Sequence, residues 1–90
     1  MDATLESITG SLDLDRLGEF LRDAAANLGG FWDPDVIVSE VVPMAEHHLG
    51  PARRVQARVV LYPERRLLVR LDDETTGGTV QEWEYVATAS

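Results

Sequence analysis

Three stretches in the second half of the chain alternate apolar and polar residues with a period of two. They are RVQARVVLY at 54–62, RLLVRLD at 66–72 and TVQEWEYVA at 79–87, and short polar turns separate them. This alternation is typical of strands that bury one face of a sheet. Because strands joined by short turns run antiparallel, the sequence predicts a three-stranded antiparallel meander whose apolar face another layer must cover.

The first half of the chain supplies a helix for that layer. Residues 13–28 place leucines and alanines at spacings of three and four, the period of an amphipathic helix. Gly29 and Gly30 follow this stripe and predict its end. We expect residues 1–10 to fray or to add a short helical turn.

A second helix is predicted over residues 33–49. Asp33 followed by Pro34 is a typical helix start, with an N-cap and a proline at the first helical position. Pro43 lies inside this segment and is expected to kink the helix. The β-branched residues at 36–42 leave an additional strand there as the alternative.

Together these patterns predict a single small α+β domain over residues 1–90, in the order ααβββ, with two N-terminal helices packed on the meander. A chain of 90 residues without cysteine has a small core and no disulfide to reinforce it. Such chains often gain stability from a partner subunit, so we expect a homodimer.

Charge and hydropathy narrow the possible functions. The net charge of −8 disfavours nucleic acid and acidic membrane surfaces as partners. The first ten residues lack the basic and apolar regions of a signal peptide, and no uncharged stretch exceeds nine residues. We therefore expect a soluble, cytoplasmic protein, and the use of arginine in place of lysine throughout indicates a bacterial origin.

One basic band interrupts this acidic chain, because six arginines cluster in and around the first two predicted strands. The turn between these strands is expected to place Arg58 opposite Arg70 on the polar face of the sheet. The third strand can neutralise the band as a ladder of surface ion pairs, with Glu84 expected directly beside Arg66. Alternatively, Arg54, Arg58 and Arg70 form a patch that binds phosphate or an acidic partner.

Four apolar residues are not easily covered by so small a domain. Phe31 and Trp32 follow the double glycine between the helices, and Val60 and Leu68 are expected to face each other on the polar side of the sheet. Exposed apolar residues of this kind tend to form contact surfaces, although Phe31 and Trp32 can instead fold under the helices as core. The first or the third strand of the meander must also be an edge that can pair across a two-fold axis.

The adjacent His47 and His48 are the residues that most suggest metal binding or acid–base chemistry. A helical metal site needs ligands three or four residues apart, and no such ligand stands at those spacings, so no metal or cofactor is predicted. On a helix His48 is expected to point into the apolar layer, and His47 to lie on the polar side. His48 is therefore the one weak catalytic candidate, in a pocket lined with Trp83 and Tyr85.

No catalytic motif supports an enzyme: the chain lacks a nucleophile elbow, a phosphate-binding glycine loop and the H-E-x-x-H pattern. The sequence therefore favours a small non-catalytic binding or regulatory module that acts through protein–protein contacts, as a homodimer. The predicted binding residues are Phe31, Trp32, Val60 and Leu68 as apolar anchors, with Arg54, Arg58 and Arg70 steering an acidic partner. The alternatives are a small enzyme or small-molecule-binding protein that uses the His48 pocket, and an acidic inhibitor such as an antitoxin, immunity or nucleic-acid-mimic protein.

Overall fold

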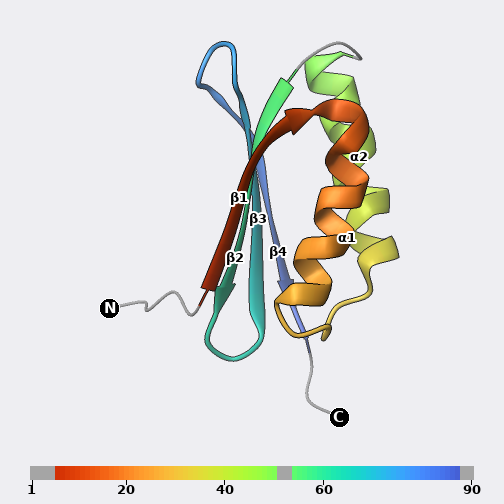
Figure 1. Ribbon diagram of the computed structural model, residues 1–90, viewed down its shortest axis with the longest axis vertical. Helices are drawn as coiled ribbons and strands as arrows, with labels where there is room; N and C mark the ends of the chain where they lie inside the picture. The colour runs from red at the N-terminus through yellow and green to blue at the C-terminus, as the bar shows by residue number, and fades with distance from the viewer. Residues whose placement is uncertain (1–5, 51–53, 88–90) are drawn as a thin grey trace.

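The computed structural model describes residues 6–50 and 54–87. In chain order the elements are β1 (Glu6–Asp13), the short 3-10 helix η1 (Leu14–Arg16), α1 (Leu17–Asn27), α2 (Pro34–Leu49), β2 (Arg54–Tyr62), β3 (Arg66–Asp73) and β4 (Thr79–Val86). The strands form one antiparallel sheet in the order β1-β2-β3-β4, and the helices lie on one face of it (Figure 1). The predicted α+β fold with an antiparallel sheet is confirmed. The predicted order ααβββ is wrong, because a fourth strand precedes the helices.

This additional strand, β1, occupies residues expected to fray or to begin the first helix. It pairs along its whole length with β2. Its inward positions are Ile8, Gly10 and Leu12, and serine and threonine alternate with them, so the contrast in hydropathy along the strand is shallow. The first helix therefore starts later than predicted, with α1 beginning at Leu17 and not at residue 13.

The second helix, α2, is uninterrupted, so the alternative strand at 36–42 is wrong. Asp33 caps it as predicted, because its Oδ1 accepts a hydrogen bond from the Asp35 N–H at 2.9 Å. Pro43 lies inside the helix on its exposed side. Because proline has no N–H, the backbone carbonyl four residues before Pro43 has no helical hydrogen-bond donor. On the exposed side of the helix, water can donate to that carbonyl instead.

The core lies between the helices and the inward face of the sheet. α1 and α2 bury residues at helical spacing, and β2 and β3 bury alternate residues. The largest fully buried side chains are Leu17, Leu21, Leu28, Ile37, Val41, Val55, Val59, Leu67, Val69 and Leu71. Within the described residues, no second layer covers the other face of the sheet, and β1 and β4 are its two edges.

The registers of the strands decide which polar side chains meet on the uncovered face. β2 and β3 pair as predicted. β3 and β4 pair two residues away from the predicted register, so Glu84 lies opposite Leu68 and not opposite Arg66. An irregularity between Leu71 and Asp72 accompanies this shift, and a prediction that assumes a symmetric loop misses it.

Candidate binding surface

Exposed apolar side chains collect at one end of the molecule. Among the described residues, the large hydrophobic side chains left exposed are Phe31, Val36 and Val86, at 52%, 46% and 57% of their area. They come from the α1–α2 loop, the start of α2 and the end of β4, yet they line one hollow of about 300 Å³, which we call the apolar hollow. Trp32 and Tyr85 also line it. Apolar side chains gathered around a hollow are typical of a contact surface.

Two glycines shape the loop that carries the aromatic pair. Gly29 and Gly30 have φ values of 118° and 70°, in the left-handed region that favours glycine. The Phe31 ring folds back over Gly29, where an added Cβ would lie 2.8 Å from the ring. Trp32 meets Phe31 edge to face at 5.8 Å between ring centroids, but Trp32 is only 8% exposed. The two neighbours therefore differ in environment, because Trp32 belongs to the core and Phe31 to the surface.

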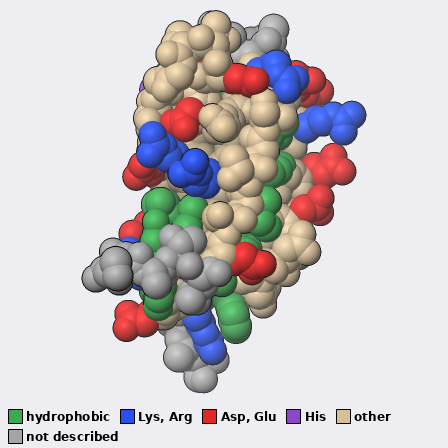
Figure 2. Space-filling model, turned by 60° about the vertical axis from the view of Figure 1, so that its left-hand side comes forward, with side chains coloured by type: hydrophobic (Ala, Val, Ile, Leu, Met, Phe, Trp, Pro, Cys, Tyr) green, Lys and Arg blue, Asp and Glu red, His purple; other side chains and the backbone are tan. Residues whose placement is uncertain are grey.

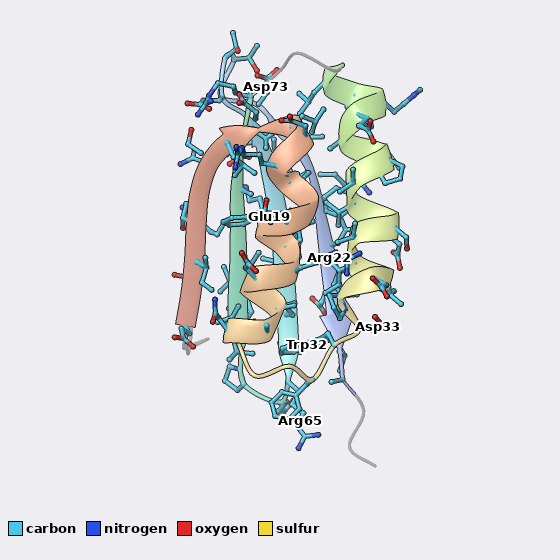
Figure 3. All side chains as sticks on the ribbon, turned by 45° about the vertical axis from the view of Figure 1, so that its right-hand side comes forward. Glu19, Arg22, Trp32, Asp33, Arg65 and Asp73 are labelled. Carbon is cyan, nitrogen blue, oxygen red and sulfur yellow. The ribbon has the colours of Figure 1, made fainter. Side chains whose placement is uncertain are left out.

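The turn between β2 and β3 holds Phe31 from another side. The Arg65 guanidinium carbon lies 4.4 Å from the centroid of the Phe31 ring, in a cation–π contact. Arg65 and Glu64 have φ values of 57° and 66°, in the left-handed region. This conformation costs about 1–2 kcal/mol for each residue other than glycine. Figure 3 shows Arg65 at the same end of the molecule as Trp32. The strained turn thus places a cation over an exposed aromatic ring at the rim of the apolar hollow.

Two residues that line the apolar hollow bury a polar atom. The indole Nε1 of Trp32 has no hydrogen-bond partner among the described residues, and the hydroxyl of Tyr85 is buried beside the carboxylate of Glu40. Burial, together with the nearby carboxylate of Glu40, raises the pKa of Tyr85 from its ordinary value near 10 to about 12. Because a buried polar group without a partner costs about 1–3 kcal/mol, such groups are uncommon in folded proteins.

The edge strand β4 gives the apolar hollow an open backbone beside it. The Ala87 N–H donates to the Arg65 carbonyl in the ladder with β3. In an antiparallel ladder, the backbone groups of alternate residues point toward the neighbouring strand, so those of the residues in between point the other way. The outward-pointing backbone groups on β4 are therefore those of Glu82, Glu84 and Val86. No described strand lies beyond β4 to bind them.

The predicted arginine patch lies on the uncovered face of the sheet, but internal carboxylates bind one end of it. Arg54 contacts Asp13 at 2.9 Å and Glu74 at 3.2 Å, so it joins the end of β1 to the β3–β4 loop. The hydrogen bond that Arg54 donates to Glu74, together with the charge of that carboxylate, raises the pKa of Arg54 above its ordinary value. The Arg54 side chain therefore has a structural role within the chain.

The middle of this face is also partly neutralised. Arg70 contacts Asp72 at 3.2 Å and Glu82 at 3.6 Å. Arg58, which faces Arg70 across the sheet, forms no ion pair with a described residue. Figure 2, which views this side of the molecule, shows basic and acidic side chains interspersed above a cluster of apolar ones. Of the three predicted steering arginines, Arg58 is thus the one without an internal ion pair among the described residues.

The other two predicted anchors are less accessible than Phe31. Val60 and Leu68 do face each other on the uncovered side of the sheet. Val60, however, is 5% exposed, and Leu68 is half-buried. Neither lines the apolar hollow, so the structure does not bring the four predicted anchors together.

Both histidines are exposed at the end of α2, with ring centroids 5.6 Å apart. The prediction that His48 points into the apolar layer is wrong. The buried stripe of α2 advances in steps of four residues from Ile37 to Leu49 and so drifts by about 40° per step, because one turn takes 3.6 residues. By the last turn the stripe has rotated away from His48.

The alternative pocket is not assembled either. His48 lines a hollow beside the β3–β4 loop, whereas Tyr85 lines the apolar hollow at the start of α2. About 18 Å of helix separates these two places, at 1.5 Å per residue between Val36 and His48. Trp83 is half-buried and lines neither hollow. Among the residues described, no group of histidine, aspartate or glutamate side chains is arranged to hold a metal ion.

Sequence reasoning missed Val36, Val86 and Arg65 as parts of the surface. Val36 and Val86 stand near the ends of elements and Arg65 stands in a turn, where a periodic pattern gives little information about burial. A turn with two non-glycine residues at positive φ also has no clear sequence signature.

No helix in the described ranges is long and apolar enough to cross a membrane. Comparisons with protein family models, with curated proteins and with solved structures find no match to this chain.

Proposed function

We propose that this protein is a small, non-catalytic binding module of the bacterial cytoplasm that takes an extended segment of a partner protein along β4. The segment adds to the sheet as a further strand and inserts an apolar side chain into the apolar hollow. The observation that carries this proposal is the convergence of Phe31, Val36 and Val86 on one hollow beside an edge strand. Main-chain hydrogen bonds give such strand addition its affinity, and pockets for alternate side chains give it specificity.

The charge of β4 indicates the chemistry of that segment. Glu82 and Glu84 are exposed on the uncovered face, beside the outward-pointing backbone groups. Their contacts with Arg70 and Arg66 are long, at 3.6 Å each, and therefore weak. A segment that alternates basic and apolar residues fits this edge, with its basic side chains near the glutamates and its apolar side chains toward the apolar hollow.

The unpaired indole N–H of Trp32 also supports this proposal, because a polar acceptor on the incoming segment relieves its desolvation cost. The enzyme alternative has less support, since its three residues line no common hollow. The acidic-inhibitor alternative is supported only by the acidic side chains on α1 among the described residues. A charged helix face of this kind ordinarily faces solvent without binding a partner.

A display library of random dodecapeptides tests the proposal. We expect selection to enrich peptides with alternating basic and apolar residues. Val36→Lys places a charge at the apolar hollow and should weaken binding of the selected peptides at least about tenfold, the loss of roughly one good apolar contact. Ser39→Lys, one turn further along α2 and outside the hollow, is the matched control and should leave binding unchanged. Enrichment without such a pattern, or equal effects of the two lysines, contradicts the proposal.

A further inference from the structure

We infer that β1, the edge opposite β4, pairs antiparallel with β1 of a second copy of the chain, so that two sheets join into one across a two-fold axis. The two β4 strands, which carry the proposed binding surfaces, then form the two outer edges of the joined sheet. This dimer uses residues separate from those proposed to bind the partner segment.

The character of β1 favours a second copy at this edge. Between Glu6 and Asp13 the strand carries no charge and no proline, although natural edge strands are usually protected by one or the other. β4 is a poorer edge for self-pairing, because Glu82 and Glu84 on one copy would oppose the same carboxylates on the other.

The faces of the sheet restrict the register. Odd-numbered residues of β1 face the uncovered side, so pairing must place odd opposite odd to keep the helices on one face. Centring the axis on Gly10 places Ile8 opposite Leu12 of the second copy and Thr9 opposite Ser11 of the second copy. The half-buried Ile8 and Leu12 then meet at apolar cross-strand pairs, which are favourable.

Helix α1 supplies charge complementarity for the same axis. Phe20 lies over Gly10, where an added Cβ would be 2.7 Å from its ring, so Phe20 is level with the axis. Arg16 and Asp23 line the hollow of about 250 Å³ beside Phe20, and neither forms an ion pair with a described residue. Along the helix they lie about 6 Å and 4.5 Å from Phe20, in opposite directions, at 1.5 Å per residue.

A two-fold axis at this level therefore brings Arg16 of each copy to the height of Asp23 of the other, within about 2 Å. The patch is self-complementary, with an aromatic ring at its centre and opposite charges at its two ends. Glu19 also lines this hollow. It lies near the axis and opposes Glu19 of the second copy, so it weakens the dimer.

Analytical ultracentrifugation tests the dimer, which should sediment at about twice the chain mass of 10.0 kDa. Arg16→Glu should weaken association at least about tenfold, because two attractions become repulsions. Arg22→Glu changes the net charge equally on the same helix, but on the side that contacts Asp35, and should change association little. Exchange of the charges by Arg16→Asp with Asp23→Arg should restore association, and Glu19→Gln should strengthen it.

The register has its own test, because the chain contains no cysteine. Thr9→Cys together with Ser11→Cys should form cross-linked dimers on oxidation, since residues directly opposite across an antiparallel pair lie within disulfide range. Ser7→Cys together with Ser11→Cys is the control for a register centred on Thr9 and should stay uncross-linked. A monomer at several hundred micromolar, a failure of the charge exchange to restore association, or cross-linking of the control pair alone overturns the inference. Peptide binding at β4 is unaffected by these variants, so the two proposals fail independently.

Discussion

The contact between Gly10 and Phe20 yields a prediction in which one substitution changes the sign of its effect. Gly10→Ala adds a Cβ that lies 2.7 Å from Phe20 Cε2 and 3.3 Å from Cδ2. Because non-bonded carbon atoms pack best at a separation of about 3.5–4 Å, the Phe20 ring must move away by about 1 Å. Overpacking of this kind costs about 1–3 kcal/mol, and the half-buried ring at the sheet edge places it near the lower value.

A second effect opposes this clash. Gly10 is not at a positive φ, so alanine fits the backbone there and lowers the entropy of the unfolded chain. That contribution stabilises the protein by about 0.5–1 kcal/mol. We therefore expect Gly10→Ala to lower the free energy of unfolding by about 0.5 kcal/mol when Phe20 is present, and to raise it by about 0.5–1 kcal/mol when Phe20→Ala has removed the ring.

Urea unfolding of the four proteins of this double-mutant cycle measures the coupling, expected at about 1–1.5 kcal/mol. The measurements are made at two protein concentrations tenfold apart, because association through β1 would add a concentration-dependent contribution. Equal effects of Gly10→Ala in the two backgrounds, within about 0.3 kcal/mol, would refute the reasoning that Phe20 determines the need for glycine.

Two further predictions concern the first turn of α2 and the apolar hollow. Asp33→Ala removes the acceptor of the Asp35 N–H and should lower the free energy of unfolding by about 1 kcal/mol, whereas Asp33→Asn should retain most of it; equal losses in thermal or urea unfolding would count against a capping role. The pKa of Tyr85 is raised to about 12 from an ordinary value near 10, so the folded state holds the proton longer than the unfolded state. Stability is therefore unaffected by this group below about pH 10 and falls as the pH rises from about 10 to 12, by about 1 kcal/mol once solvent screening of the partly exposed ring is considered. In urea unfolding between about pH 10 and 12, Tyr85→Phe should lose less stability than the unsubstituted protein. An identical fall in both proteins would contradict a raised pKa for Tyr85.

The sequence predicted those parts of the fold in which hydropathy alternates strongly. The helices, the pairing of β2 with β3 and the cap at Asp33 follow from local patterns of a few residues. β1 was not predicted because one of its inward positions is Gly10 and the residues between them are small and polar. Such a segment shows little alternation in hydropathy and is held as a strand by its pairing with β2. The register of β4 escaped because it depends on an irregularity next to Leu71.

The candidate surface was harder to predict than the fold. Nothing in the pair Phe31-Trp32 indicates that the first ring is exposed and the second buried, because this depends on where the double glycine directs the chain. Val36 and Val86 are 50 positions apart in the sequence and meet only after α2 has packed beside β4. Likewise, the internal partners of Arg54 come from the end of β1 and from the β3–β4 loop.

The position of β1 in the chain also sets the order in which the sheet can form. β2, β3 and β4 are joined by turns of a few residues, whereas the whole helical pair separates β1 from β2. Closing a loop of about 40 residues costs roughly 3 kcal/mol of chain entropy before any strand contact repays it. Local pairings of low sequence separation form faster, so we expect the three-stranded meander to assemble first and β1 to join last. Until then β2 is an open edge, and a newly made chain is most prone to exchange its first strand with a neighbour during this interval.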